Sequence, residues 1–486
     1  MRQLLRQRMR KTLPRDFVSR LRSVVGDAYA IDDEETLLRH ARDETPNLTP
    51  SLPDVVVRPG SVDEVQAVMR LCAKDGVYVT PRGAGSGKAG GCVAVYGGVV
   101  LVLDRLNRIR VIDRDDQVAH VEPGVILQTF QEAVEAEGMF YPPDPASLSW
   151  CTLGGNVACN AGGPRALKYG VTGHYVLGVE AVLPTGERIK TGRQTTKGVA
   201  GYDVTSLLTG SEGTLAILTD ITLKLLPAPR FVQTALAVFP STEPAVKAVS
   251  AMLAGGVLPR TLEFMDKDSI EAVRVMNPPY RFPAYAGAAL IIETDGDSEA
   301  GTLEALERCL QVTTEHGAVD AFLATDARQR RDIWASRRLL SEATRKIKKK
   351  KVSEDIVVPR SRIPEMVART TQLGDKHRLS TCSFGHAGDG NLHTQVLFDD
   401  DDELPRVEAL LDDLFGVVLA LGGTITGEHG VGLSKKKYLP LELGADMLAL
   451  QRRLKDAFDP AGILNPGKFL PDKLALHAAK ADAAGR

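Results

Sequence analysis

From residue 55 to residue 226 the chain consists mostly of short apolar segments separated by glycine. Runs of this kind that are rich in valine, isoleucine and leucine are typical of β-strands. Ser61 is followed three residues later by Glu64, a capping-box pattern that marks the start of a helix. The pattern predicts strands at 77–80, 97–103, 117–122 and 215–225, and helices at 61–75 and 128–137.

The pattern changes after a Pro-Ala-Pro break at 227–229, where we expect a domain boundary. Strand-like and helix-like segments now alternate, which is typical of an α+β layer with helices packed on a sheet. The predicted strands are 231–239, 258–265, 288–293 and 318–324, and the predicted helices are 244–253, 302–316 and 327–347.

A chain of 486 residues is too long for one ordinary hydrophobic core, so we expect two or three domains. Hydrophobic residues make up 43% and charged residues 25%, which is the balance of a soluble globular protein. The 60 basic and 62 acidic side chains nearly cancel, so nucleic acid is not expected as a partner. No apolar run reaches the roughly 18 residues that a membrane span needs.

The six cysteines are scattered without a Cys-x-x-Cys pair, which argues against a zinc ribbon or an iron–sulfur cluster held by this chain. Reduced thiols and no visible secretory signal indicate a cytoplasmic protein, with peripheral association at the inner membrane as the alternative. The arginine-rich residues 1–15 run into an amphipathic pattern at Phe17, which favours an N-terminal helix over a mitochondrial presequence.

The glycine-rich segment after the first predicted strand matches two nucleotide-binding motifs only in part. A Walker loop would need glycine at Arg82 and a hydroxyl residue at Ala89. Gly85, Gly87 and Gly90 have dinucleotide-fold spacing, but strand-like residues follow where that fold needs a helix. Backbone N–H groups of such a loop can instead hold an anion, and a hairpin without a ligand is the alternative.

Two further glycine clusters follow the first, at 152–163 and at 208–217. Glycine allows a ligand to approach the backbone closely. Three separate clusters of this kind therefore suggest one large, extended ligand that is contacted mainly by main chain.

Two histidines flank a short turn near the end of the chain. His386 and His393 are separated by a segment that contains Gly-Asp-Gly-Asn, and a hairpin there would bring both imidazoles to one point. Glu428 supplies a hard oxygen ligand, and two imidazoles with a carboxylate are a common set for a divalent metal. The alternative is a turn with buried histidines that bind no metal.

One arginine falls on the apolar face of the predicted helix 327–347. That face is marked by Ile333, Leu340 and Ile347. At about 100° per residue, Arg337 lies about 40° from the first of these positions, whereas Arg338 lies on the flank. A buried guanidinium needs an anion, either an internal carboxylate or the carboxylate of a ligand.

In their order along the chain, these motifs resemble the vanillyl-alcohol-oxidase/p-cresol-methylhydroxylase superfamily from about residue 53 to 469. The resemblance is to its FAD-linked D-2-hydroxyacid dehydrogenases, which include the glycolate oxidase flavoprotein subunit, D-lactate dehydrogenase and D-2-hydroxyglutarate dehydrogenase. It implies an α+β fold with a PCMH-type FAD-binding domain and a ferredoxin-like substrate cap. The implied domains are 1–228 for FAD, 229–427 for the cap and 428–486 as a segment returning to the FAD domain.

The resemblance also implies the cofactor site. A histidine that links flavin covalently in some relatives is replaced here by Ser86, which implies non-covalent FAD. The implied FAD-binding residues are Arg82, Gly83, Ala84, Gly85, Ser86, Gly87, Gly90, Gly91, Pro143, Asp144, Ser147, Gly154, Gly155, Ala158, Gly162, Gly163, Glu212, Gly213, Ile217 and Asn465.

By the same resemblance, His386, His393 and Glu428 bind zinc or manganese, and His429 is the catalytic base. The segment that ends in Arg337 is similar to the family's Trp-x-x-Arg, whose arginine binds the substrate carboxylate. Further implied substrate contacts are Ser341 and Gln395. The lysines at 348–351 are expected to form a solvated face, with the docking of an acidic electron acceptor as the alternative.

The resemblance implies an enzyme that oxidises a small 2-hydroxyacid of the glycolate or D-lactate type to the 2-oxoacid. Hydride would pass to FAD, and electrons would leave for an iron–sulfur subunit, an electron-transfer flavoprotein or a quinone. A homodimer is a further expected assembly. The alternatives are a D-2-hydroxyglutarate dehydrogenase, a non-redox enzyme of the alkyl-dihydroxyacetone-phosphate synthase type, and a non-catalytic flavoprotein subunit.

Overall fold

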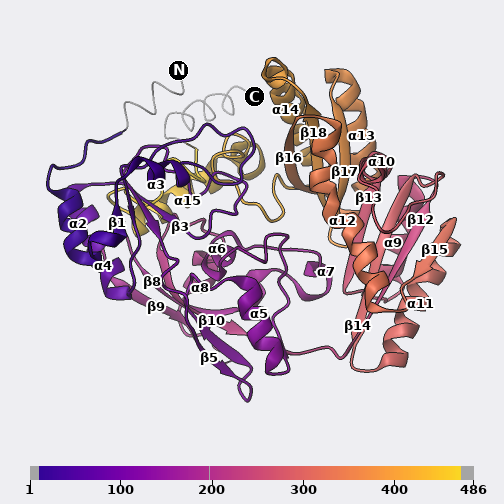
Figure 1. Ribbon diagram of the computed structural model, residues 1–486, viewed down its shortest axis with the longest axis horizontal. Helices are drawn as coiled ribbons and strands as arrows, with labels where there is room; N and C mark the ends of the chain where they lie inside the picture. Colours follow the sequence, from indigo (N-terminus) through magenta and orange to yellow (C-terminus); the bar gives the residue numbers. More distant parts are fainter. Residues whose placement is uncertain (1–9, 196, 472–486) are drawn as a thin grey trace. The chain divides into compact units, whose positions relative to one another are not determined.

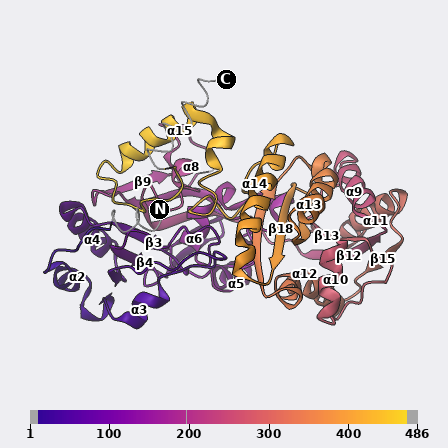
Figure 2. The ribbon, with the colours of Figure 1, turned by 90° about the horizontal axis from the view of Figure 1, so that it is seen from above.

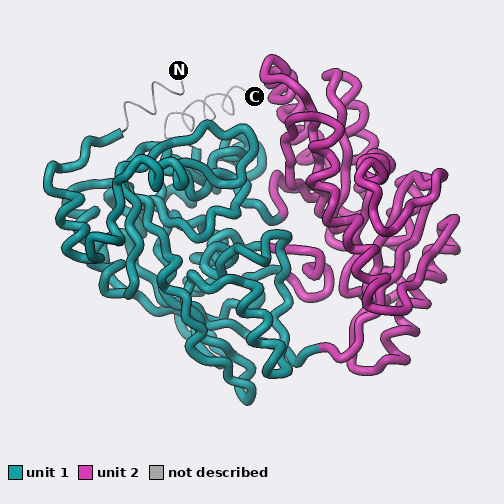
Figure 3. The backbone as a smooth tube through the Cα atoms, in the orientation of Figure 1, with its two compact units in different colours: residues 1–161, 171–228, 428–486 teal, residues 162–170, 229–427 magenta. Residues whose placement is uncertain are grey.

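The computed structural model describes residues 10–195 and 197–471 (Figure 1). These residues form two compact units (Figure 3). Unit 1 comprises the described residues of Met1–Ala161, Val171–Ala228 and Glu428–Arg486, and unit 2 comprises Gly162–Gly170 and Pro229–Gly427. Gly162–Gly170 was expected in the first domain. It groups with unit 2, where Lys168 Nζ and Tyr169 Oη donate to the carboxylate of Asp295.

The first sheet of unit 1 has four strands and a hydrophobic core against two helices. Its order is β1 (Ala30–Ile31), β2 (Val55–Val57), β4 (Val99–Val102) and β3 (Val79–Arg82). The core side chains come from these strands and from α2 (Phe17–Val25) and α4 (Val62–Asp75). Half of the predicted capping box is present. Ser61 Oγ accepts the Glu64 N–H, but the Glu64 carboxylate accepts the N–H of Gly60 and not that of Ser61.

The second sheet of unit 1 is antiparallel. Its order is β5 (Ile109–Asp113), β6 (Val118–Val121), β10 (Ile217–Lys224), β8 (Val176–Val182) and β9 (Arg188–Gly192). The short strands β7 (Met139–Phe140) and β11 (Leu226–Pro227) pair separately. In the described part of unit 1, further α-helices are α3 (Glu34–Arg39), α5 (Leu127–Ala136), α6 (Leu153–Cys159), α8 (Val204–Leu208) and α15 (Leu439–Phe458).

The segment after α15 inserts into the core of the first sheet. Ile463 and Leu464 are fully buried there. The Val79 N–H donates to the Ile463 carbonyl, and the Asn465 N–H donates to the Val79 carbonyl. These bonds hold Asn465 beside the glycine-rich segment that follows β3.

Unit 2 is built on a seven-stranded antiparallel sheet. Its order is β15 (Asp320–Leu323), β12 (Phe231–Phe239), β14 (Ala288–Gly296), β13 (Thr261–Asp266), β17 (Ser380–His386), β18 (Asn391–Phe398) and β16 (Lys350–Val357). One face carries α9 (Thr242–Ala254), α11 (Glu299–Glu315), α13 (Ile363–His377) and α14 (Leu404–Ala420). The other carries α10 (Lys267–Val275) and α12 (Ala327–Ile347) (Figure 2). The short α7 (Ala166–Tyr169) also belongs to this unit.

The helix predicted at 327–347 is confirmed as α12, but its predicted apolar face is wrong at one end. Ile333 and Leu340 are fully buried, whereas Ile347 is 42% exposed. At about 100° per residue, the helical phase of Ile347 falls between those of the buried Ser336 and Leu340. Ile347 is the last residue of α12, so its exposure comes from its place at the helix end and not from a turn of the apolar face. No helix in the described ranges is long and apolar enough to cross a membrane.

Candidate active site

One face of the seven-stranded sheet carries a row of buried polar side chains. Residues that face each other across antiparallel strands project from the same side of a sheet. Glu263 faces His386, and His393 faces Asp355, on neighbouring strands of this sheet. All four side chains are buried. Strand register therefore gathers two histidines and two carboxylates at one part of the sheet.

The hairpin predicted between the two histidines is confirmed as β17 and β18. His386 ends the first strand, His393 lies in the second, and their rings are 5.2 Å apart between centroids. The turn requires glycine at Gly390, where φ is +89° and a Cβ atom would lie 2.1 Å from the Val358 carbonyl oxygen. A larger residue at Gly390 would displace the turn and so change the relative positions of the His386 and His393 rings.

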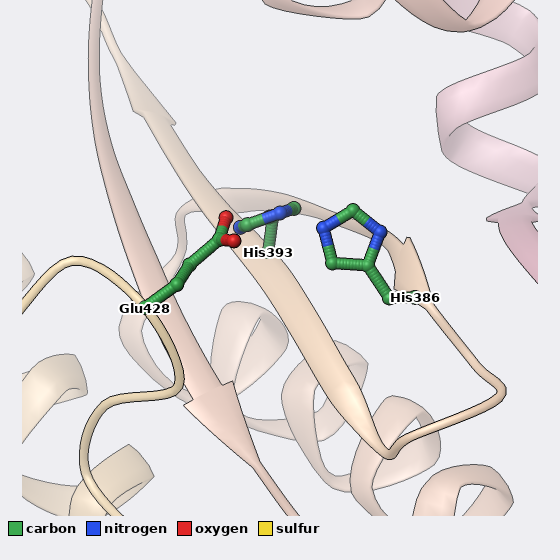
Figure 4. Close-up of side chains that lie close together, drawn as sticks. All are labelled: His386, His393 and Glu428. Carbon is green, nitrogen blue, oxygen red and sulfur yellow. The ribbon is translucent and has the colours of Figure 1, made fainter. Parts of the chain in front are cut away.

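The ligand atoms of His386, His393 and Glu428 lie within 4.8 Å of one another (Figure 4). Glu428 is held close because the preceding Gly427 donates its N–H to the buried carboxylate of Asp355 over 2.8 Å. Thr426 Oγ1 donates to the same carboxylate over 2.9 Å. Two imidazole nitrogens and a carboxylate oxygen suit a divalent metal. The predicted ligand set is thus brought together.

Glu263 bridges a histidine and an arginine, a role that sequence analysis missed. Its side chain is 0% exposed. Its Oε1 accepts a hydrogen bond from His386 Nδ1, and its Oε2 accepts one from Arg337 Nε at 2.7 Å. Burial alone would raise the pKa of this carboxyl, but the charges of His386 and Arg337 outweigh burial and lower the pKa to about 2.

Arg337 takes an internal anion through only part of its guanidinium. Its Nε binds Glu263, and the group lies over the Phe384 ring, 4.6 Å from the centroid. Among the residues that the structure describes, no hydrogen bond is made by its two terminal Nη groups. The side chain is 14% exposed, whereas Arg338 is on the exposed flank as predicted. An internal carboxylate therefore binds the Nε of Arg337, and the two Nη groups remain as donors without a described partner.

The other predicted substrate residues lie in contrasting surroundings. Ser341 is exposed, and its hydroxyl accepts a hydrogen bond from Lys351. Gln395 is buried; its Nε2 donates to Ser353 Oγ, and its Oε1 has no partner within the described ranges. Of these two residues, Gln395 is therefore the one whose buried side-chain oxygen can still accept a hydrogen bond.

The loop after β3 has the properties of an anion cradle. Gly85 and Gly90 have φ of +86° and +78°, and a Cβ on Gly90 would lie 2.9 Å from Leu433. Within the described part of the chain, no backbone N–H from 83 to 92 donates to a protein acceptor. No helix follows the loop, in agreement with the rejected dinucleotide motif. Unpaired N–H groups on a glycine backbone fit a phosphate.

Arg82, at the start of this loop, donates to the Arg42 carbonyl and to Cys92 Sγ, so its guanidinium is already bound by protein. The second glycine cluster forms α6, where Thr152 Oγ1 accepts the Gly155 N–H. A Cβ on Gly154 would lie 2.5 Å from Pro123, so this glycine is required for packing.

Asn465 and Glu212 connect three distant segments of unit 1. Asn465 Nδ2 donates to the carbonyls of Gly91 and Glu212 at 2.9 Å each. The buried Glu212 carboxylate accepts the N–H groups of Val431 and Gly432 at 2.6 and 2.7 Å. It therefore fixes the turn that follows His429.

His429 lies next to one of the metal-type ligands. Its Nε2 is 3.8 Å from the nearer oxygen of Glu428, and both side chains are 15% exposed. Among the remaining predicted cofactor residues, Pro143, Asp144, Ser147, Ala158, Gly213 and Ile217 belong to unit 1, and Gly162 and Gly163 belong to unit 2.

Comparison with known proteins first defines the class of fold. The structure of p-cresol methylhydroxylase with bound substrate aligns with a TM-score of 0.78 at 18% identity, covering 93% of this chain and 96% of that one. An alkyldihydroxyacetonephosphate synthase aligns with a TM-score of 0.73 at 20% identity, covering 94% and 86%. The fold is therefore that of the vanillyl-alcohol-oxidase/p-cresol-methylhydroxylase flavoproteins, as predicted.

Sequence comparison then defines the family. Residues 53–192 match the family described as FAD binding domain, and residues 228–469 match FAD linked oxidases, C-terminal domain. Glycolate oxidase subunit GlcD of Bacillus subtilis is 40% identical, with 94% of this chain and 97% of that protein covered. D-lactate dehydrogenase of Anaerostipes hadrus is 37% identical, with 86% and 89% covered. The chain belongs to the FAD-linked oxidases, and the predictions of FAD and of an oxidoreductase are confirmed.

We expect the FAD to be released by acid, because Ser86 stands at the position where, by the family resemblance, relatives with covalently linked flavin carry the linking histidine. Acid precipitation of the yellow protein should leave the flavin absorbance in the supernatant. Flavin that stayed in the washed pellet would contradict non-covalent binding.

Proposed function

We propose that this protein oxidises a small 2-hydroxyacid of the glycolate or D-lactate type to the 2-oxoacid. The supporting observation is that unit 2 sets the histidine pair of a metal-type site beside a partly buried arginine with two available Nη groups. A 2-hydroxyacid carries an alcohol oxygen next to a carboxylate. A divalent metal can bind the alcohol oxygen, and an arginine can bind the carboxylate. Relatives at 36–40% identity that are named glycolate oxidase subunits or D-lactate dehydrogenases support the same class.

We assign the metal to His386, His393 and Glu428, with zinc and manganese both suited to these ligands. A divalent ion there would lower the pKa of the substrate hydroxyl and hold its oxygen in place. Glu263 keeps the proton on His386 Nδ1, so that the lone pair of Nε2 can bind a cation.

Arg337 is assigned to the substrate carboxylate through its two Nη groups. The guanidinium is planar, and a carboxylate can accept one hydrogen bond from each Nη group, with the two bonds parallel. Gln395 is the second polar group offered to the substrate, through its buried amide. Ser341 stays a prediction that would require its exposed hydroxyl to exchange Lys351 for the substrate.

His429 is assigned as the general base that accepts the proton of the substrate hydroxyl. Such a base is typically worth about 10²–10⁴-fold in rate. The Glu212 carboxylate accepts the backbone N–H groups of Val431 and Gly432, which follow His429 by two and three residues. The backbone that carries the imidazole is therefore held in place. FAD, when bound at the glycine loops, supplies the two-electron acceptor.

Electrons must then leave for an external carrier, because the sequence has no cluster motif and no nicotinamide site. An iron–sulfur subunit, an electron-transfer flavoprotein or a quinone would serve. We place the protein in the cytoplasm, with peripheral attachment at the inner membrane and a homodimer as further parts of the proposal. An artificial dye is the suitable acceptor for steady-state assays.

The proposed substrate class predicts that glycolate and D-lactate bleach the bound flavin without oxygen. A panel of D- and L-2-hydroxyacids, followed at the flavin absorption maximum, would measure this. Bleaching mainly by D-2-hydroxyglutarate would favour the dicarboxylate alternative, and no bleaching by any hydroxyacid would contradict the proposed oxidation. The similarity to an alkyldihydroxyacetonephosphate synthase rests on fold alone at 20% identity.

A further inference from the structure

We propose that Glu263 is the positioning residue of the metal site and that it couples the metal ligand His386 to Arg337. This inference rests on the proposed function, because it concerns the same metal. No motif in the sequence points to Glu263, and the residue itself would touch neither the metal nor the substrate.

The geometry of the bridge supports this role. Each carboxylate oxygen of Glu263 has its own donor, His386 Nδ1 on Oε1 and Arg337 Nε on Oε2. Glu263 and His386 also face each other across paired strands, so their backbones hold the side chains in register. A metal-binding histidine is commonly oriented by a carboxylate on its other ring nitrogen, and loss of that partner weakens metal binding by about 10- to 100-fold.

Arg337 has two tasks in this arrangement. Its charge stabilises the buried carboxylate, which would otherwise be costly to keep ionised without water. Its Nε is used for this purpose, and its Nη groups make no hydrogen bond to any described residue. One planar guanidinium can therefore hold Glu263 and a substrate carboxylate together, which a lysine cannot do.

A second buried carboxylate on the same sheet provides a matched control. Glu293 lies on the neighbouring strand and accepts hydrogen bonds from Thr234 Oγ1 and Trp334 Nε1, both at 2.7 Å. It is also buried beneath α12, but no histidine is among its hydrogen-bond partners in the described ranges. If removing any buried charge under α12 weakened metal binding, Glu293→Gln should therefore weaken it as well.

The test measures binding of Zn²⁺ and Mn²⁺ to metal-stripped, FAD-loaded full chain by calorimetry. We expect Glu263→Gln to weaken the affinity by about 10- to 100-fold, with flavin content unchanged. Glu293→Gln should bind metal as the wild type does. If Glu263→Gln does not fold because Arg337 is left without its anion, the charge-neutral double variant Glu263→Gln/Arg337→Gln replaces it, with the same expected loss.

The outcomes separate the two hypotheses. If the wild-type chain takes up no metal, the metal in the proposed function fails, and this inference fails with it. If the wild type binds metal and the folded Glu263 variant binds it within twofold, only the positioning role is overturned. An equal loss in Glu293→Gln would also overturn it, because the effect would then be general to the sheet. Failure of both Glu263 variants to fold while Glu293→Gln folds would make Glu263 a structural ion pair and would likewise overturn the role.

Discussion

His386→Ala and Glu428→Gln are each expected to abolish turnover while FAD stays bound. The reason is that each variant removes one ligand from a set whose atoms lie within 4.8 Å of one another. The glycine loops that we assign to FAD are separate in sequence from both residues, so flavin content should not change. Elemental analysis should find about one divalent ion per wild-type chain and much less in both variants.

His377→Ala is a suitable control for the loss of a histidine in the same unit. His377 lies at the end of α13 and pairs with Asp413 at 2.7 Å, away from the proposed ligand set. It should retain both metal and turnover. A wild-type preparation that stays fully active after exhaustive chelation, with no metal left, would contradict the assignment of the metal.

Arg337→Ala is expected to lower kcat/KM by about tenfold to a thousandfold. Losing one partner of a buried charged pair costs roughly 2–5 kcal/mol in binding systems, which is about 30- to 5,000-fold. The expected loss is set lower because the Arg337 side chain is 14% exposed. Two charges depend on Arg337 in our assignment, Glu263 through Nε and the substrate carboxylate through the Nη groups. Arg337→Lys keeps the charge but can serve only one of them, so it should recover only part of the activity.

Arg338→Ala provides the control for the helical phase. Arg338 is exposed, and its guanidinium donates to the backbone carbonyl of Arg331 in the same helix. Steady-state kinetics with the best hydroxyacid from the panel, together with melting temperatures, would compare the two variants. Equal losses in both, with lowered stability, would indicate that Arg337 is a structural residue and does not bind substrate.

The sequence alone determined the features that depend on neighbours along the chain. The turn between His386 and His393 is short and glycine-rich, which predicted a hairpin that brings the two histidines together, and the structure has this hairpin. The helical period placed Arg337 on the covered face of α12 and Arg338 outside it. The glycine clusters indicated close backbone approach, and the order of these motifs predicted the family.

Only the tertiary structure decided which groups meet across the sheet. Glu263 lies 123 residues before His386, and Asn465 lies 374 residues after Gly91. Apolar periodicity predicts that a strand exists and which face is covered, but it carries no information on which strand lies beside which. Strand order and register made a buried glutamate in an ordinary strand the partner of both His386 and Arg337. The sequence therefore predicted that Arg337 needs an anion, and the fold decided that Glu263 supplies it to Nε and leaves the two Nη groups for a ligand.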